Sequence, residues 1–249
     1  MKKITLFIIS CTLFLSGCAT VYFPLKKDTY FQNKPQAPKT VALLPFEVDC
    51  YSPILISNTM EMLDKKTKEA KDFTVKALTE ELASKSYKIT KYLSADEIQK
   101  DDFDKDTLTI LDELYNEFNS AEYSLRKNLN EDKGKPFDYS IGLLANELKD
   151  TFQQKPDILA FVFPGGYIND LGVFSPLSKA SYAIMSLGMS LLNPTPNDSI
   201  VITTVLIDTK NGDIIWYNSN FSYSRSLLSF EHIKEAIHKN LSALPNAKE

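Results

Sequence analysis

The fold is decided by one stretch, Ser199-Ile200-Val201-Ile202-Thr203-Thr204-Val205-Leu206-Ile207-Asp208-Thr209-Lys210-Asn211-Gly212-Asp213-Ile214-Ile215-Trp216-Tyr217. Two apolar runs rich in β-branched residues flank an Asn-Gly pair, and this arrangement predicts a β-hairpin. Asn211 and Gly212 are expected to supply the positive backbone angles of a tight turn. The returning strand is expected to end near Tyr223.

The segments before and after this hairpin predict the elements that pack with it. Apolar or alternating runs predict three further strands, at 40–46, 87–93 and 157–163. Helical spacing of apolar residues predicts four helices, at 67–84, 108–129, 141–152 and 230–244. Pro164-Gly165-Gly166 is expected to end the third strand, 48–57 to form a loop, and Ser229 to cap the last helix. The order β-α-β-α-α-β-β-β-α predicts an α/β fold of the α+β type, a mixed sheet with helices packed on it.

Composition sets the broad class of the protein. The 249 residues include 43% hydrophobic and 11% aromatic residues, enough for a substantial core and unlike a disordered chain. We therefore expect a single α/β domain over 40–245. The net charge of −4 and the lack of a basic stripe argue against nucleic acid as a partner.

The first residues have the layout of a bacterial secretory leader. Lys2 and Lys3 precede an apolar run that ends in Leu15-Ser16-Gly17-Cys18. The run has about a dozen residues, whereas a transmembrane anchor needs about 20. A soluble secreted protein with a chance cysteine is the other alternative, and the small residues before Cys18 argue against it.

The end of the leader resembles the lipobox of bacterial lipoproteins. The resemblance implies that a signal peptide, 1–17, is removed and that diacylglycerol is added to the Cys18 sulfur, with further acylation by a chain such as palmitate. By the same resemblance, Ala19 directly after the cysteine favours localisation at the outer membrane, on its periplasmic side. Residues 18–39 are then the lipidated cysteine and a flexible tether, which could reach about 70 Å when extended. Its lysines either rest on anionic headgroups or are simply solvated.

The remaining cysteine allows no intramolecular disulfide. Cys11 lies in the leader and Cys18 would be acylated, which leaves Cys50 as the one free thiol. Cys50 is either inert or forms a mixed disulfide with a partner.

Neither a metal site nor an enzyme site is predicted. His232 and His238 are six residues apart and would not share a helix face, and the acids of 101–106 lack the glycine and glutamate of a calcium loop. No nucleophile, base and orienting group occur in a recognisable arrangement, and Gly165-Gly166 lacks the rest of a phosphate-binding loop. We therefore expect no catalytic residue and no cofactor.

One weakly charged stretch is the candidate contact segment. Residues 171–192 contain a single charge, Lys179, and several small residues. The stretch is too short to span a bilayer comfortably and is a buried helix, a contact helix, or a segment that dips into the membrane surface. The partner-contact candidates are Tyr182, Met185, Leu187, Gly188 and Met189.

Three segments in order resemble a bacterial envelope group. They are Val41-Ala42-Leu43-Leu44-Pro45-Phe46 after the tether, the helix ending Leu82 to Lys88 before a strand, and the hairpin from Leu206 to Trp216. The group includes CsgG, LpoB and the N-terminal domain of TolB. The resemblance implies an anticodon-binding-domain-like α/β sandwich that contacts proteins and not RNA. Against that small fold, about 94–152 and 164–198 are inserted segments.

Together these observations lead to an expected function. We expect a lipid-anchored cell-envelope lipoprotein that acts by protein-protein contact, as an accessory or scaffold of a cell-wall synthesis or export machine. Its partners would be membrane lipid, through acylated Cys18, and an envelope protein or a second copy of the chain. The alternative is a CsgG-like oligomeric outer-membrane secretion component.

Overall fold

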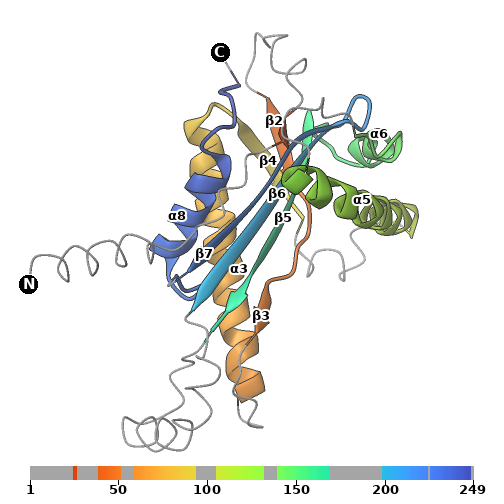
Figure 1. Ribbon diagram of the computed structural model, residues 1–249. Coiled ribbons are helices and arrows are strands. Elements are labelled where there is room, and N and C mark those ends of the chain that lie inside the picture. The colour runs from red at the N-terminus through yellow and green to blue at the C-terminus, as the bar shows by residue number, and fades with distance from the viewer. Residues whose placement is uncertain are drawn as a thin grey trace, which may run out of the picture.

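The computed structural model describes residues 25–26, 39–51, 59–93, 105–131, 139–168, 198–223 and 225–247. They form a seven-stranded sheet in the order β1-β7-β6-β5-β2-β4, with β3 paired to β5 (Figure 1). β2 pairs with β4 and β5 in parallel, whereas β5, β6 and β7 are antiparallel neighbours. The fold is therefore an α+β fold with a mixed sheet, as predicted.

The predicted succession of elements is present in the structure. Its strands are β2 (Thr40–Leu43), β4 (Lys88–Tyr92), β5 (Ile158–Tyr167), β6 (Ser199–Asp208) and β7 (Ile214–Tyr223). Its helices are α3 (Thr59–Ser84), α5 (Lys105–Glu131), α6 (Leu144–Asp150) and α8 (Phe230–Leu241). Two short strands, β1 (Leu25–Lys26) and β3 (Asp49–Tyr51), were not predicted.

The β6–β7 hairpin forms where the sequence predicts it, but its turn is built differently. The strands pair from Ser199 opposite Tyr223 to Ile207 opposite Ile214. Gly212 has a φ of 74°, whereas Asn211 is not among the residues with positive φ. The expectation for Asn211 is wrong because the connection is longer than a two-residue turn: the Gly212 N–H donates to the Asp208 carbonyl at 2.9 Å.

The prediction that Pro164-Gly165-Gly166 ends a strand is also wrong, because β5 continues to Tyr167. β5 pairs with β2 through Ala160 and with β3 from Gly165 onward. Pro164 lies in the interval between these two partners, where the missing N–H of proline is tolerated. Asp49–Tyr51, expected within a loop, is the strand that pairs with this continuation.

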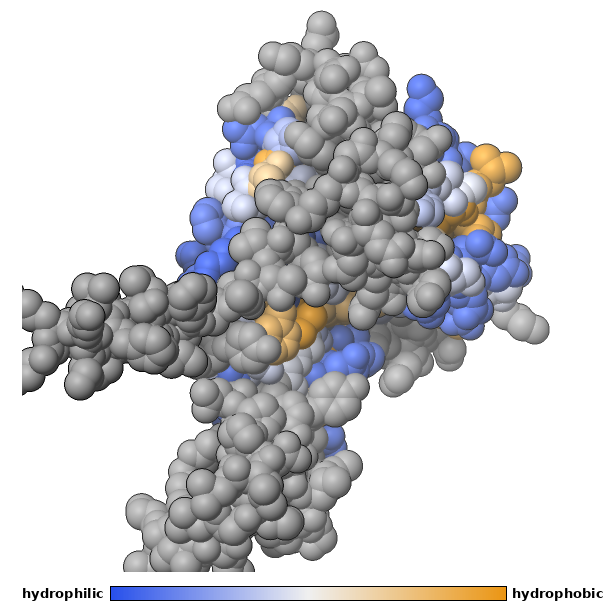
Figure 2. Space-filling view, in the orientation of Figure 1, coloured by the Kyte–Doolittle hydropathy of each residue, from blue (hydrophilic) through white to orange (hydrophobic). Residues whose placement is uncertain are grey.

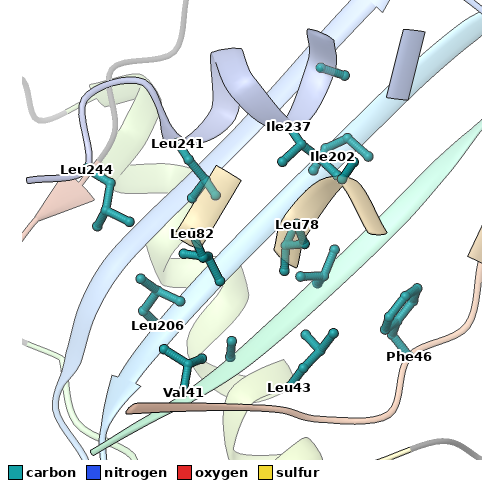
Figure 3. Packing of buried hydrophobic residues seen from close by; sticks show 14 of the residues in the cluster. Val41, Leu43, Phe46, Leu78, Leu82, Ile202, Leu206, Ile237, Leu241 and Leu244 are labelled. Carbon is teal, nitrogen blue, oxygen red and sulfur yellow. The ribbon is translucent and has the colours of Figure 1, made fainter. Parts of the chain in front are cut away.

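In the described part of the chain, two helices cover each face of the sheet. On one face, α3 and α8 enclose a hydrophobic cluster with side chains from β2, β5, β6 and β7 (Figure 3). On the other face, α5 and α6 enclose a second cluster that includes Phe118, Phe161 and Tyr217. The Phe118 and Phe161 rings stack with their centroids 5.5 Å apart. The helices of 94–152, which the resemblance presents as an insertion, thus supply the second hydrophobic layer.

Local signals in the sequence fix several helix ends. The Ser229 side chain accepts a hydrogen bond from the His232 N–H, so the predicted cap of α8 is confirmed. At the end of α3, the Ser86 N–H donates to Ala83 and the Tyr87 N–H to Leu82, which is a Schellman motif. Ser86 has a φ of 65°, a left-handed conformation that glycine adopts more readily.

A buried pair of amides fastens α8 to the hairpin. Asn218 Nδ2 donates to the Asn240 carbonyl at 2.6 Å, and Asn240 Nδ2 donates to the Ile202 carbonyl at 2.8 Å. Both side chains are almost completely buried. The hydrogen bonds from the two Nδ2 groups hold the helix in one register over β6 and β7, since a shift would leave buried donors and carbonyl groups unpaired, which is costly.

Candidate interaction surface

The predicted site residues lie outside the described part of the chain. This holds for Cys18 and for the contact candidates Tyr182, Met185, Leu187, Gly188 and Met189. The structure does describe the residues next to them, namely Leu25–Lys26 after the leader, and Ile168 and Asp198 on either side of 169–197. The candidate surface is therefore built from these points of attachment.

The points of attachment on either side of 169–197 lie at one end of the sheet, which we call the distal end. It is defined by Tyr167 opposite Ser199 and by Ser199 opposite Tyr223. The loop between β6 and β7 lies at the opposite end, which we call the turn end. Because β5 and β6 are antiparallel neighbours, the chain leaves the sheet at Ile168 and returns at Asp198 beside it.

The distal end is closely packed. A Cβ added at Gly166 would overlap the Ser199 carbonyl oxygen and approach Leu227 Cδ1 to 3.0 Å. Leu227 and Ile168 are fully buried, and the Arg225 N–H donates to the Asp198 carbonyl at 3.2 Å. Glycine is required at position 166 because β5 and β6 approach each other so closely there.

Next to the distal end, one face of the sheet has an exposed aromatic side chain, Phe221, beside the partly buried Val201. We call this part of the sheet the distal face. Phe163 lies opposite Thr203, Thr203 opposite Ser219, and Val201 opposite Phe221. Phe221 is 37% exposed. The hydroxyl oxygens of Thr203 and Ser219 are hydrogen-bonded to each other at 2.8 Å. Figure 1 shows α5 and α6 in front of the turn half of this face, and Figure 2 shows hydrophobic surface bordered by grey residues.

An ion pair connects α8 with the segment that joins it to β7, next to the distal end. Arg225 Nε donates to Glu235 Oε2 at 2.9 Å, and Lys239 Nζ donates to Glu235 Oε1 at 2.8 Å. These hydrogen bonds, that of Lys239 first, lower the pKa of Glu235 to about 2. The His232 ring accepts the Ser226 N–H through Nδ1 at 3.1 Å, so this side chain ties the start of α8 to the segment before it.

Cys50 lies at the distal end, in β3. It pairs with Gly166, and its side chain is half-buried among residues of the α3–α8 cluster. Burial raises the pKa of the Cys50 thiol, with a smaller contribution from the nearby Asp49 carboxylate, whereas a hydrogen bond with Thr67 lowers it. The thiol is therefore mostly protonated at neutral pH, which favours the inert interpretation over mixed-disulfide formation.

The end of the chain that follows the leader pairs with the sheet. Leu25 lies opposite Tyr217 and Lys26 opposite Trp216, so β1 adds an antiparallel strand to β7. These residues fall within 18–39, the segment predicted as a flexible tether, and the pairing holds part of that segment against the folded body. Sequence reasoning missed β1 because two residues carry no strand signal of their own and the partner strand is far away in the chain.

The described residues contain neither a metal-binding cluster nor a membrane-spanning helix. Within the ranges that the structure describes, no three His, Cys, Asp or Glu side chains cluster in a way that could bind a metal ion. Among the same residues, none of the helices has the length and apolar character needed to cross a membrane.

The described residues define an α+β protein with a mixed sheet covered by helices on both faces. No protein-family model matches the sequence, and no curated protein matches it. One similar solved structure is the PelC dodecamer from Paraburkholderia phytofirmans in space group P6, which is 11% identical in sequence and is matched over 85% of this chain and 91% of that chain. Another is a point variant of that protein in space group C2, which is 10% identical and is matched over 87% of this chain and 94% of that chain. Both have a TM-score of 0.29, which is too low to support an argument about fold or function.

Proposed function

We propose that this chain is a lipid-anchored protein of the bacterial cell envelope that acts by contacting other proteins. The observation that carries the proposal is the leader, in which a short apolar run ends in Leu15-Ser16-Gly17-Cys18. Acyl chains on Cys18 would anchor the body, because each buried methylene contributes about 0.8 kcal/mol and two or three chains together give a durable attachment.

Two features of the described residues support a role in protein contact. The distal face exposes one aromatic side chain, Phe221, beside the partly buried Val201, and aromatic residues are enriched at protein interfaces. The body is also well packed on both sides of the sheet, so it can present a surface without first folding onto a partner. We propose that the partner is an envelope protein of a cell-wall synthesis or export machine, or a second copy of this chain.

The anchor is tested by labelling cells with a palmitate analogue. We expect the full chain to be labelled and to fractionate with membranes, and the Cys18→Ser variant to lose both properties. Cys50→Ser and Cys11→Ser are the matched controls, since each removes one thiol and leaves Cys18 in place. An unlabelled parent, or a Cys18→Ser variant that matures and fractionates like the parent, would overturn the proposal.

The contact role is tested by crosslinking in the native envelope followed by identification of the crosslinked proteins. We expect a specific envelope partner or a discrete self-crosslinked species, and we expect Phe221→Glu to weaken it while leaving α-helical content unchanged. Size in mild detergent separates the two versions of the role. A monomer or dimer supports an accessory protein, whereas a large ring favours a CsgG-like secretion component.

A further inference from the structure

The direction of β1 carries information about how the body is oriented on a membrane. β1 is antiparallel to β7, with Leu25 opposite Tyr217 and Lys26 opposite Trp216. Moving backward along the chain from Leu25 therefore corresponds to moving forward along β7, toward Tyr223. Residues that precede Leu25 thus approach the sheet from the side of the distal end and not from the turn end.

The length of the connecting segment sets how far the lipid can be from the sheet. Six residues, 19–24, separate Cys18 from Leu25, so the two Cα atoms are seven residue steps apart and at most about 24 Å from each other. The strand from Tyr217 to Tyr223 advances six residues, or about 20 Å. A chain that continues in the direction of β1 therefore brings Cys18 to the level of the distal end and little beyond it.

We propose that the distal end of the sheet faces the bilayer, held there by the pairing of β1 with β7 and the short connection to acylated Cys18. This inference rests on the proposed lipid anchor and adds an orientation to it. The occupant of the distal end is thus a lipid surface, and the turn end, with Lys210 and Asn211, faces away from it.

A second observation agrees with this orientation. A long, weakly charged stretch of the chain, 171–192 with Lys179 alone, is attached at the same end through Ile168 and Asp198. Desolvation of charged groups near lipid is costly, so a stretch with few charges is better tolerated beside a bilayer than the charged loop at the turn end. That loop contains Asp208, Lys210 and Asp213.

The proposal also changes the role expected for the tether. A free tether from Cys18 to Lys39 would let the body stand off the membrane and rotate. With β1 paired, only 19–24 remain between the lipid and the sheet, so the body lies against the membrane in one orientation. The start of α8, which contains Glu231, is then close to the lipid. The Arg225 N–H, shortly before this helix, donates to the Asp198 carbonyl at the distal end.

The test measures energy transfer from each end of the body to labelled lipid. The lipidated full chain with Cys50→Ser receives a donor dye at Glu231→Cys, near the distal end, or at Lys210→Cys, in the turn; both positions are exposed. Each protein is reconstituted into vesicles of phosphatidylethanolamine and phosphatidylglycerol with a headgroup-labelled acceptor. The two ends of β7 are roughly 30 Å apart, so we expect transfer from position 231 to be at least about twice that from position 210.

A matched variant separates the effect of the short connection from that of the anchor. About 20 Gly and Ser residues inserted between Ala19 and Thr20 keep the lipid and β1 but lengthen the reach several-fold, and we expect the difference between the two labels to shrink. Equal transfer from both positions in the parent, greater transfer from position 210, or a difference that the insertion leaves unchanged would each overturn the proposed orientation. A parent that does not float with vesicles would instead refute the lipid anchor itself.

Discussion

Replacement of Gly166 by alanine tests the close approach of β5 and β6 at the distal end. Gly166 lies in the strand that pairs with β3 on one side and β6 on the other. A Cβ at this position would overlap the Ser199 carbonyl oxygen, which is a backbone atom and cannot rotate away as a side chain can. The two strands must therefore separate or twist to accept the methyl group.

The size of the effect follows from the kind of atom that blocks the new methyl group. Overpacking of a well-packed core costs typically about 1–3 kcal/mol, and a clash with backbone belongs at the upper end of that range. We expect Gly166→Ala to lower the free energy of unfolding by about 3 kcal/mol. For a domain of about 200 residues this corresponds to a fall in Tm of about 6–12 °C.

The neighbouring glycine provides the control. A Cβ at Gly165 would meet the Asp49 carbonyl oxygen at 3.4 Å and Asp49 Cβ at 3.5 Å, which are ordinary contacts. Gly165→Ala should therefore change stability by less than about 1 kcal/mol. Urea unfolding of the Cys18→Ser protein, followed through the fluorescence of buried Trp216, compares the variants. Equal unfolding midpoints for the two glycine variants would refute the reasoning.

Four further changes have expected outcomes. Asn240→Ala should lower the unfolding free energy by about 1–3 kcal/mol, because it leaves the Ile202 carbonyl without its donor; an unchanged urea midpoint would contradict this. Glu235→Gln should destabilise by less than about 1 kcal/mol at neutral pH. The pKa of Glu235 is lowered to about 2, so its contribution is present above its ordinary pKa of 4.5 and is lost as the pH falls through 2; thermal midpoints of parent and variant should therefore converge at low pH. Cys50 should react with iodoacetamide several-fold more slowly in the folded than in the unfolded protein, since burial raises its pKa; equal rates would exclude this. Ser86→Gly should raise the unfolding free energy by up to about 1 kcal/mol, measured by urea titration, because the φ at this position is 65°.

The sequence predicts the elements whose signals are local. The β6–β7 hairpin is predicted because two long apolar runs flank a turn that contains Gly212, and the cap of α8 because Ser229 immediately precedes an amphipathic segment. In both cases a few adjacent residues determine the structure. The mixed sheet follows from the order of these segments along the chain.

The elements that the sequence does not predict depend on distant partners. Pro164 and the two glycines after it are usual strand breakers, yet β5 continues through them because β3 and β6 pair with it on either side. β3 and β1 have three and two residues and gain their structure from pairing with β5 and β7. The candidate contact residues, such as Met185, lie outside the described residues, so their role stays a prediction.

The edge strand β4 has a consequence for crowded copies of the protein. Among the residues that the structure describes, β4 pairs with β2 alone, and Lys88 and Lys91 are exposed along it. Lysines on a border strand place like charges where a neighbouring sheet would have to align, which disfavours strand-by-strand growth into fibrils. Many copies held side by side on one surface would therefore repel along this border and remain dispersed.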